Sequence, residues 1–130
     1  MSTRSLIGKL NPDNTVTYIY CHFDGYPSGV GSTLTRYYNS PILIDQLLAL
    51  GDLSVLGPEI GKQQDFSDRD NLNRNWCLAY GRDRGEENIE AKTVDVETYL
   101  DQANHGEDFK YLYLENEWDA YDWKGNPILF

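Results

Sequence analysis

Residues 15–23 constrain the fold more than any other segment, because both faces of the strand that they predict are largely apolar. One face carries Val16, Tyr18, Tyr20 and His22, and the other carries Thr17, Ile19, Cys21 and Phe23. Such a strand belongs inside a sheet that is covered, at least partly, on both sides. Residues 5–10 alternate as well, and the turn formers Asn11-Pro12-Asp13-Asn14 between the two segments predict a β-hairpin.

Helical patterns follow this hairpin. Ser32 is a suitable N-cap for a short helix that reaches Tyr38, and Pro41 favours the start of a second helix that ends at Gly51. The apolar stripe that we expect on this second helix consists of Ile42, Leu43, Gln46, Leu47 and Leu50. The connection at 52–58 is rich in turn formers, and residues 61–75 are polar enough for a long surface loop.

The C-terminal half predicts further strands. Residues 76–80 and 93–94 have strand character, and residues 81–86 read as a charged loop between two glycines. Asp95 predicts the N-cap of a helix that ends near residues 104–106 and has one apolar face, formed by Val96, Tyr99, Leu100 and Ala103. Residues 109–114 and 118–123 alternate around Glu115-Asn116-Glu117, which predicts a second, aromatic-rich hairpin.

The order of these elements predicts an α+β fold: an antiparallel sheet of the N- and C-terminal hairpins plus a central strand, with two or three helices packed on it. A length of 130 residues with 40% hydrophobic content suits a single domain, 1–130. No apolar run is long enough to span a membrane and no signal peptide is evident, so we expect a cytoplasmic protein without a membrane partner. In a reducing compartment, Cys21 and Cys77 are expected to be buried free thiols.

Negative charge is concentrated between residues 86 and 122. This segment holds twelve acidic residues against Lys92 and Lys110, so it accounts for the whole formal net charge of −10. Phosphate repulsion argues against direct nucleic-acid binding there, whereas a basic surface of another protein is a suitable partner; solubility alone is the alternative explanation. The residues expected to form this protein-binding surface are Glu107, Asp108, Glu115, Glu117, Trp118, Asp119, Asp122 and Trp123.

The two tryptophans in that set leave a further alternative open. An exposed aromatic edge of the C-terminal hairpin would allow a homodimer, whereas Trp118 and Trp123 buried within one chain would not.

A second candidate site involves the glycine-rich segment 20–31 and the arginines of segment 81–86. In an extended loop Arg82 and Arg84 would point to one side and could grip a phosphate or carboxylate. Tyrosines nearby could stack on a base, so a nucleotide-type ligand fits this set; pairing of the arginines with neighbouring acids is the alternative. The candidate ligand-binding residues are Arg4, Tyr20, His22, Asp24, Tyr26, Arg82 and Arg84, with Tyr80 as a further stacking ring.

Motifs for catalysis, metals and cofactors are weak. Cys21 and His22 are adjacent on a strand and point to opposite faces, so they form no dyad with each other, although His22 could pair with Asp24. His105 is distant in sequence and completes no metal-ligand spacing. The glycines Gly25, Gly29 and Gly31 lack the lysine of a phosphate-binding loop. We therefore expect no enzyme, no metal and no cofactor.

Four segments resemble a family of small, uncharacterised proteins of bacteriophages and prophages. They are Thr3-Arg4-Ser5-Leu6-Ile7-Gly8, Tyr20-Cys21-His22-Phe23-Asp24-Gly25-Tyr26-Pro27, Leu50-Gly51-Asp52-Leu53-Ser54 and Ala79-Tyr80-Gly81-Arg82-Asp83-Arg84-Gly85. The resemblance implies a setting and transfers no site residue. Small acidic phage proteins are often counter-defence factors, which include inhibitors of CRISPR and restriction enzymes and binders of immune signalling nucleotides.

Two functions follow as expectations for a protein in the cytoplasm of an infected bacterial host. The first is a non-enzymatic anti-CRISPR or antirestriction inhibitor whose acidic C-terminal third mimics DNA and binds a basic surface of a host defence protein. The alternative is a binder or sponge of a nucleotide-type small molecule that uses the glycine-rich and arginine loops.

Overall fold

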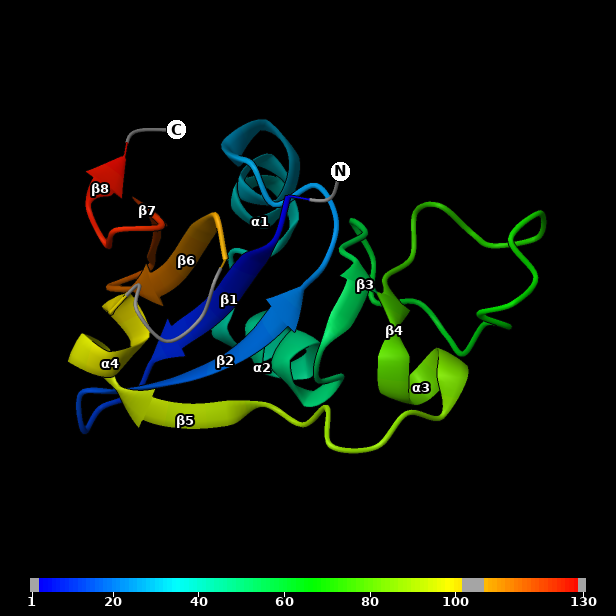
Figure 1. The fold of residues 1–130 in the computed structure, drawn as a ribbon, viewed down its shortest axis with the longest axis horizontal. Coiled ribbons are helices and arrows are strands. Elements are labelled where there is room, and N and C mark those ends of the chain that lie inside the picture. The colour runs from blue at the N-terminus through cyan, green and yellow to red at the C-terminus, as the bar shows by residue number, and fades with distance from the viewer. Residues whose placement is uncertain (1–2, 102–106, 129–130) are drawn as a thin grey trace.

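The computed structural model of the chain describes residues 3–101 and 107–128 (Figure 1). The strands are β1 (Ser5–Leu10), β2 (Thr15–Cys21), β3 (Leu53–Val55), β4 (Leu78–Ala79), β5 (Lys92–Asp95), β6 (Phe109–Leu114), β7 (Glu117–Asp122) and β8 (Pro127–Ile128). The helices are α1 (Ser32–Tyr37), α2 (Pro41–Ala49), α3 (Tyr80–Arg84) and α4 (Val96–Leu100), and a π-helical turn, η1 (Pro27–Gly31), leads into α1.

Within the described residues, all eight strands form one sheet in the order β4-β3-β2-β1-β6-β7-β8, and β5 pairs separately with β2. The predicted α+β class and both predicted hairpins are confirmed. The sheet is nevertheless mixed and not antiparallel throughout, because β1 pairs with β6 and β2 pairs with β3 in parallel. Strand β1 therefore connects the two hairpins within the sheet, because it pairs with β2 on one edge and runs parallel to β6 on the other.

Strand β2 is the interior strand that its two apolar faces predict. One edge pairs with β1 along its length, and the other edge is shared: β5 covers residues 15–18 and β3 pairs at Cys21. Between these two partners, the backbone N–H of Tyr20 donates to the Asp52 carboxylate over 3.0 Å. This half-buried side chain therefore completes the edge of the strand where no other strand reaches it.

The sheet has a hydrophobic cluster on each face. Helices α1 and α2 cover one face, where Ile7 and Ile19 pack with Leu34, Ile44 and Leu47. On the other face α4 contributes Tyr99, which packs with Leu6, Val16, Tyr18 and Leu112. Gly8 allows this packing, since a Cβ there would lie 2.9 Å from the Tyr99 ring. Both cysteines are buried free thiols, as predicted, and burial raises the pKa of Cys21 to about 12.

The structure corrects several helix predictions. The buried stripe of α2 consists of Ile44, Leu47 and Leu48, whereas Ile42 is 70% exposed, so the predicted stripe was wrong by part of a turn. A short strand, β3, lies in the segment predicted as turns. Asp95 caps α4 as predicted by accepting the backbone N–H of Thr98. That helix ends at Leu100, and the predicted positions from Ala103 to residue 106 lie outside the described residues.

No helix in the described part of the chain is long and apolar enough to cross a membrane.

The C-terminal hairpin separates the two tryptophans that the sequence could not distinguish. Trp118 is buried against Tyr113, and its indole N–H donates to the Tyr38 carbonyl over 2.8 Å. Trp123 directly follows β7 and is 54% exposed. Its ring centroid lies 5.1 Å from the Lys124 Nζ atom. Trp118 is therefore part of the core, and only Trp123 remains as a surface anchor.

We expect Trp118→Phe to lower the free energy of unfolding by about 2–4 kcal/mol, because it shrinks a buried ring and leaves the Tyr38 carbonyl without its donor. The matched variant Trp123→Phe should change it by less than about 0.5 kcal/mol. Urea unfolding of both variants measures the difference, and equal effects would contradict the separate placement of the two rings.

Candidate functional site

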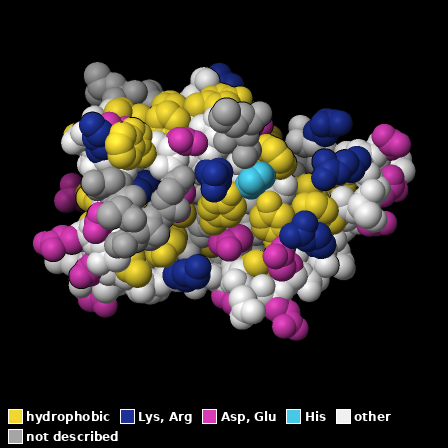
Figure 2. All heavy atoms as spheres, in the orientation of Figure 1, with side chains coloured by type: hydrophobic (Ala, Val, Ile, Leu, Met, Phe, Trp, Pro, Cys, Tyr) yellow, Lys and Arg dark blue, Asp and Glu magenta, His cyan; other side chains and the backbone are white. Residues whose placement is uncertain are grey.

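Tyr20 and His22 begin a surface that we call the ring face; its other members are Arg4, Phe66, Tyr80 and Arg84. The Tyr20 hydroxyl and His22 Nδ1 are 2.7 Å apart and hydrogen bonded. Both side chains project from the end of β2 on the face of the sheet that α4 partly covers. Figure 2 shows this face, where hydrophobic side chains surround the histidine and basic side chains flank them.

Arg4 lies close enough to Tyr20 for its positive charge to act on the phenol. A tautomer of His22 that accepts the Tyr20 proton at Nδ1 carries its own proton on Nε2 and can donate it to a ligand. Burial raises the pKa of Tyr20, with Arg4 opposing the shift, so the phenol is neutral at physiological pH.

Helix α3 supplies the other half of the ring face. Tyr80 stacks on Phe66 with ring centroids 5.7 Å apart. The Arg84 guanidinium lies 4.8 Å from the Phe66 centroid and 4.7 Å from that of Tyr80, and it also pairs with Glu86. Cation–π contact and an ion pair thus hold one exposed cation against two rings.

Arg82 is not part of this surface, contrary to the prediction. Residues 80–84 form a helix and not an extended loop, so Arg82 and Arg84 do not point to one side. The guanidinium of Arg82 donates to the carbonyls of Ile60 and Cys77 over 2.7 Å each and pairs with Asp83, whose side chain is fully buried. Arg82 therefore secures the protein interior and is unavailable to a ligand.

The glycine-rich segment also differs from its prediction. Asp24 accepts from the Tyr26 hydroxyl over 3.1 Å and does not bond to His22. The backbone N–H groups of Gly25 and Gly29 are used within the protein, by the carbonyls of Thr3 and Tyr26. These glycines serve close packing, since a Cβ on Gly29 would lie 2.3 Å from the Asp24 carbonyl oxygen. The backbone N–H groups of Gly25 and Gly29 are therefore not available to bind a phosphate.

The acidic residues of the C-terminal third divide between two ends of one hairpin. In the β6–β7 register Phe109 faces Asp122 and Leu114 faces Glu117, about 17 Å apart along the strands. Asp108, Asp122 and Trp123 lie at the first end, where Asp108 accepts from the Arg4 backbone and Asp122 accepts the N–H groups of Lys124 and Asn126. Glu107 is buried, and Asp119 is half-buried between the two ends.

Carboxylates from three parts of the chain meet at the second end. We call this surface the acidic end, and its exposed members are Asp13, Asp95, Glu97, Glu115 and Glu117. Leu10, Val96 and Leu114 pack against one cluster, which brings together the β1–β2 turn, the start of α4 and the β6–β7 turn. Acidic side chains accordingly gather at the left of Figure 2.

One ring-face residue and one residue beneath the ring face were missed by the sequence reasoning. Phe66 lies in the polar segment 61–75, where one aromatic residue among polar ones gave no periodic signal. Asp52 accepts the Tyr20 N–H beneath the ring face, and burial, as the main cause, raises its pKa. Among the described residues, no group of three or more His, Cys, Asp or Glu side chains could hold a metal ion. His105 lies outside those residues.

Comparisons of the chain with protein-family models, curated proteins and solved structures found no match.

We expect Arg82→Ala to lower the free energy of unfolding by about 3–5 kcal/mol, because it leaves the buried Asp83 carboxylate without its cation. Arg84→Ala removes the same charge from a side chain that is 47% exposed, and should cost less than about 1 kcal/mol. Chemical denaturation of the two variants tests this contrast, and a larger loss from Arg84→Ala would reverse the assigned roles.

Proposed function

We propose that the protein is a non-enzymatic counter-defence inhibitor of phage origin, and that its acidic end occupies the basic, DNA-binding surface of a host defence protein. The observation that carries this proposal is the convergence of five exposed carboxylates from three chain segments on one end of the sheet. Like charges gathered on one small surface repel each other and are relieved by a basic partner.

The β6–β7 turn gives this surface independent support. Its two central residues, Glu115 and Asn116, have φ angles of 49° and 65°. Such left-handed turns favour Asn, Asp or Gly, and a glutamate there is disfavoured by about 1 kcal/mol or more. A residue that works against its local backbone preference points to a role outside folding. At Glu115, that role is the charge.

Hydrogen bonds keep part of the acidic end ionised. The Thr15 hydroxyl and N–H lower the pKa of Asp13, and the Thr98 hydroxyl and N–H do the same for Asp95. A carboxylate with a lowered pKa remains charged at any pH where an ordinary one is charged, and somewhat below. The acidic end therefore presents fixed negative charge throughout the physiological range.

The test uses two triple variants with the same change of charge. Glu97→Gln/Glu115→Gln/Glu117→Gln removes three charges from the acidic end and leaves Asp13 and Asp95, which bond to the backbone, unchanged. The exposed control is Glu59→Gln/Asp70→Asn/Glu87→Gln. A host protein captured from lysate is purified, and its affinity for each variant is measured at low and high salt. The acidic-end variant should bind at least about tenfold more weakly than the control, with a smaller salt dependence.

DNA should compete with the wild-type protein for the same partner. Equal affinity of the two triple variants, absence of competition by DNA, or recovery of no protein partner would each contradict the proposal. Matching melting temperatures of both variants exclude a folding defect as the cause.

The second candidate function is binding of a nucleotide-type ligand at the ring face. The observation that favours it is the placement of Arg4, His22 Nε2 and Arg84 around Tyr20 and Tyr80. Cationic donors could bind phosphate, and the exposed parts of the rings could stack on a base. This arrangement keeps five of the residues that the sequence nominated and drops Arg82, Asp24 and Tyr26.

We expect one member of a panel of mono-, di- and cyclic nucleotides to raise the melting temperature of the wild-type protein through this site. Arg4→Ala and Arg84→Ala should each abolish the shift, whereas Lys124→Ala, which removes an exposed lysine on the β7–β8 turn, should retain it. Differential scanning fluorimetry makes the measurement. An unchanged melting temperature across the panel rules this function out.

A further inference from the structure

Residues 61–75 form a long connection without a regular helix or strand, yet internal bonds define its shape. The Gln64 N–H donates to the buried Asp83 carboxylate over 2.8 Å, and the Gln64 side chain spans the loop, donating to the Cys77 carbonyl and accepting from Asn73 N–H. Phe66 N–H donates to the Asp83 carbonyl. A loop of this length inside a compact domain commonly has a function, and this one is pre-organised.

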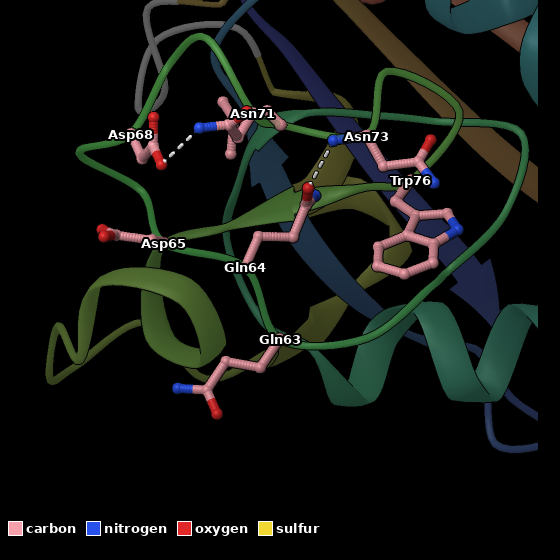
Figure 3. A pocket seen from close by; sticks show the side chains of 8 residues that line it. Gln63, Gln64, Asp65, Asp68, Asn71, Asn73 and Trp76 are labelled. Carbon is pink, nitrogen blue, oxygen red and sulfur yellow. Dashed lines mark hydrogen bonds between the residues drawn. The ribbon is translucent and has the colours of Figure 1, made fainter.

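Residues of the loop, together with Trp76, line an open pocket of about 290 Å³ (Figure 3). A second hollow of about 150 Å³ adjoins it and shares Gln64, Leu72, Asn73 and Trp76. The second hollow adds the apolar side chains of Val55 and Leu78. Together the two hollows approach the size range of sites for small molecules, with one apolar part and one polar part.

Trp76 forms the wall between these parts. Its ring lies against Gly61, where a Cβ would approach Cγ to 2.2 Å, and Gly61 has a φ of 69° that favours glycine. Trp76 is half-buried. Figure 3 shows the ring across the pocket from the Asp68–Asn71 pair. Gly61 thus packs closely against the indole of Trp76, and Trp76 also lines the pocket.

The polar rim alternates acceptors and donors. Asn71 Nδ2 donates to one oxygen of Asp68 over 2.8 Å, which leaves the other Asp68 oxygen and the Asn71 carbonyl oxygen for a ligand. Asn73 Oδ1 accepts the Asn75 N–H, so its amide N–H₂ is available. Asp65 nearby is anionic, because bonds from the Ser67 hydroxyl and N–H lower its pKa. These carboxylates repel phosphate and other anions.

We propose that this loop pocket binds a neutral saccharide ring, with Trp76 against its apolar C–H face and Asp68, Asn71 and Asn73 around its hydroxyl groups. A hydroxyl group both donates and accepts, which matches carboxylate and amide groups that alternate on the rim. A sugar ring also has one apolar face of C–H groups, which packs on an indole. The site is separate from the acidic end and does not depend on it.

The test titrates the protein with methyl glycosides of glucose, galactose, mannose and N-acetylglucosamine, and follows backbone amide signals by NMR. At least one glycoside should saturate shifts confined to residues 61–76 with millimolar affinity. Trp76→Ala should weaken it by at least about tenfold, and Trp123→Ala, an exposed tryptophan elsewhere, should not. The 6-phosphate of the same sugar should bind more weakly than the neutral form.

Asn71→Ala provides a second variant in case Trp76→Ala perturbs the loop, because Asn71 is exposed and contributes one bond to Asp68. It should weaken the glycoside while leaving the melting temperature within a few degrees of wild type. Absence of any saturable shift, unchanged affinity in both variants, or preferential binding of nucleosides over glycosides would overturn the proposal.

Discussion

The structure depends on how the backbone hydrogen-bonding groups of β2 find partners along the edge that β3 and β5 share. A strand buried on both faces cannot leave backbone N–H groups unpaired, and β5 and β3 leave a gap opposite Tyr20. The Asp52 carboxylate fills it, and the same residue accepts the Tyr80 N–H with its carbonyl and donates its own N–H to Ile89. Gly51 permits this approach, since a Cβ there would lie 2.3 Å from the Ile89 carbonyl oxygen. Asp52 thus connects the centre of the sheet to α3 through hydrogen bonds.

The ring face is a consequence of this junction. Tyr20 lies at the gap and His22 directly after β2, while the backbone of Tyr80 is bonded to Asp52 and places α3 with Arg84 beside them. On the other side of α3, Asp83 and Arg82 face inward and secure the base of loop 61–75. The ring face and the loop that lines the pocket are therefore both held by one short helix. Tyr80 and Arg84 are four positions apart and share one side of α3, whereas Arg82 and Asp83 face the interior, which explains why two arginines two positions apart have unrelated roles.

Local patterns predicted what depends on local physics. The two apolar faces of residues 15–23 predicted an interior strand, and Asp95 predicted a cap, because each signal lies within one element. The parallel β1–β6 pairing joins residues about a hundred positions apart and has no such signal. Gly81 and Gly85 suggested a loop, yet Gly85 ends a helix with φ at 73°. Trp118 and Trp123 lie an odd number of residues apart, so alternation alone separates their faces, but only the packing of Tyr38 shows which one is buried.

The charge at the acidic end has two origins that the structure separates. Asp13 and Asp95 are needed locally, as a turn acceptor and a helix cap, so their carboxylates would be present in a protein with no acidic partner. Glu117 makes no such contribution, and Glu115 works against its left-handed backbone. Solubility alone would be served equally by acids at less costly positions on the surface. A negative surface maintained at a disfavoured turn favours the proposed partner that meets the end of the hairpin, where Glu117 belongs to the last pair of β6 and β7 and Glu115 lies in the turn beyond it.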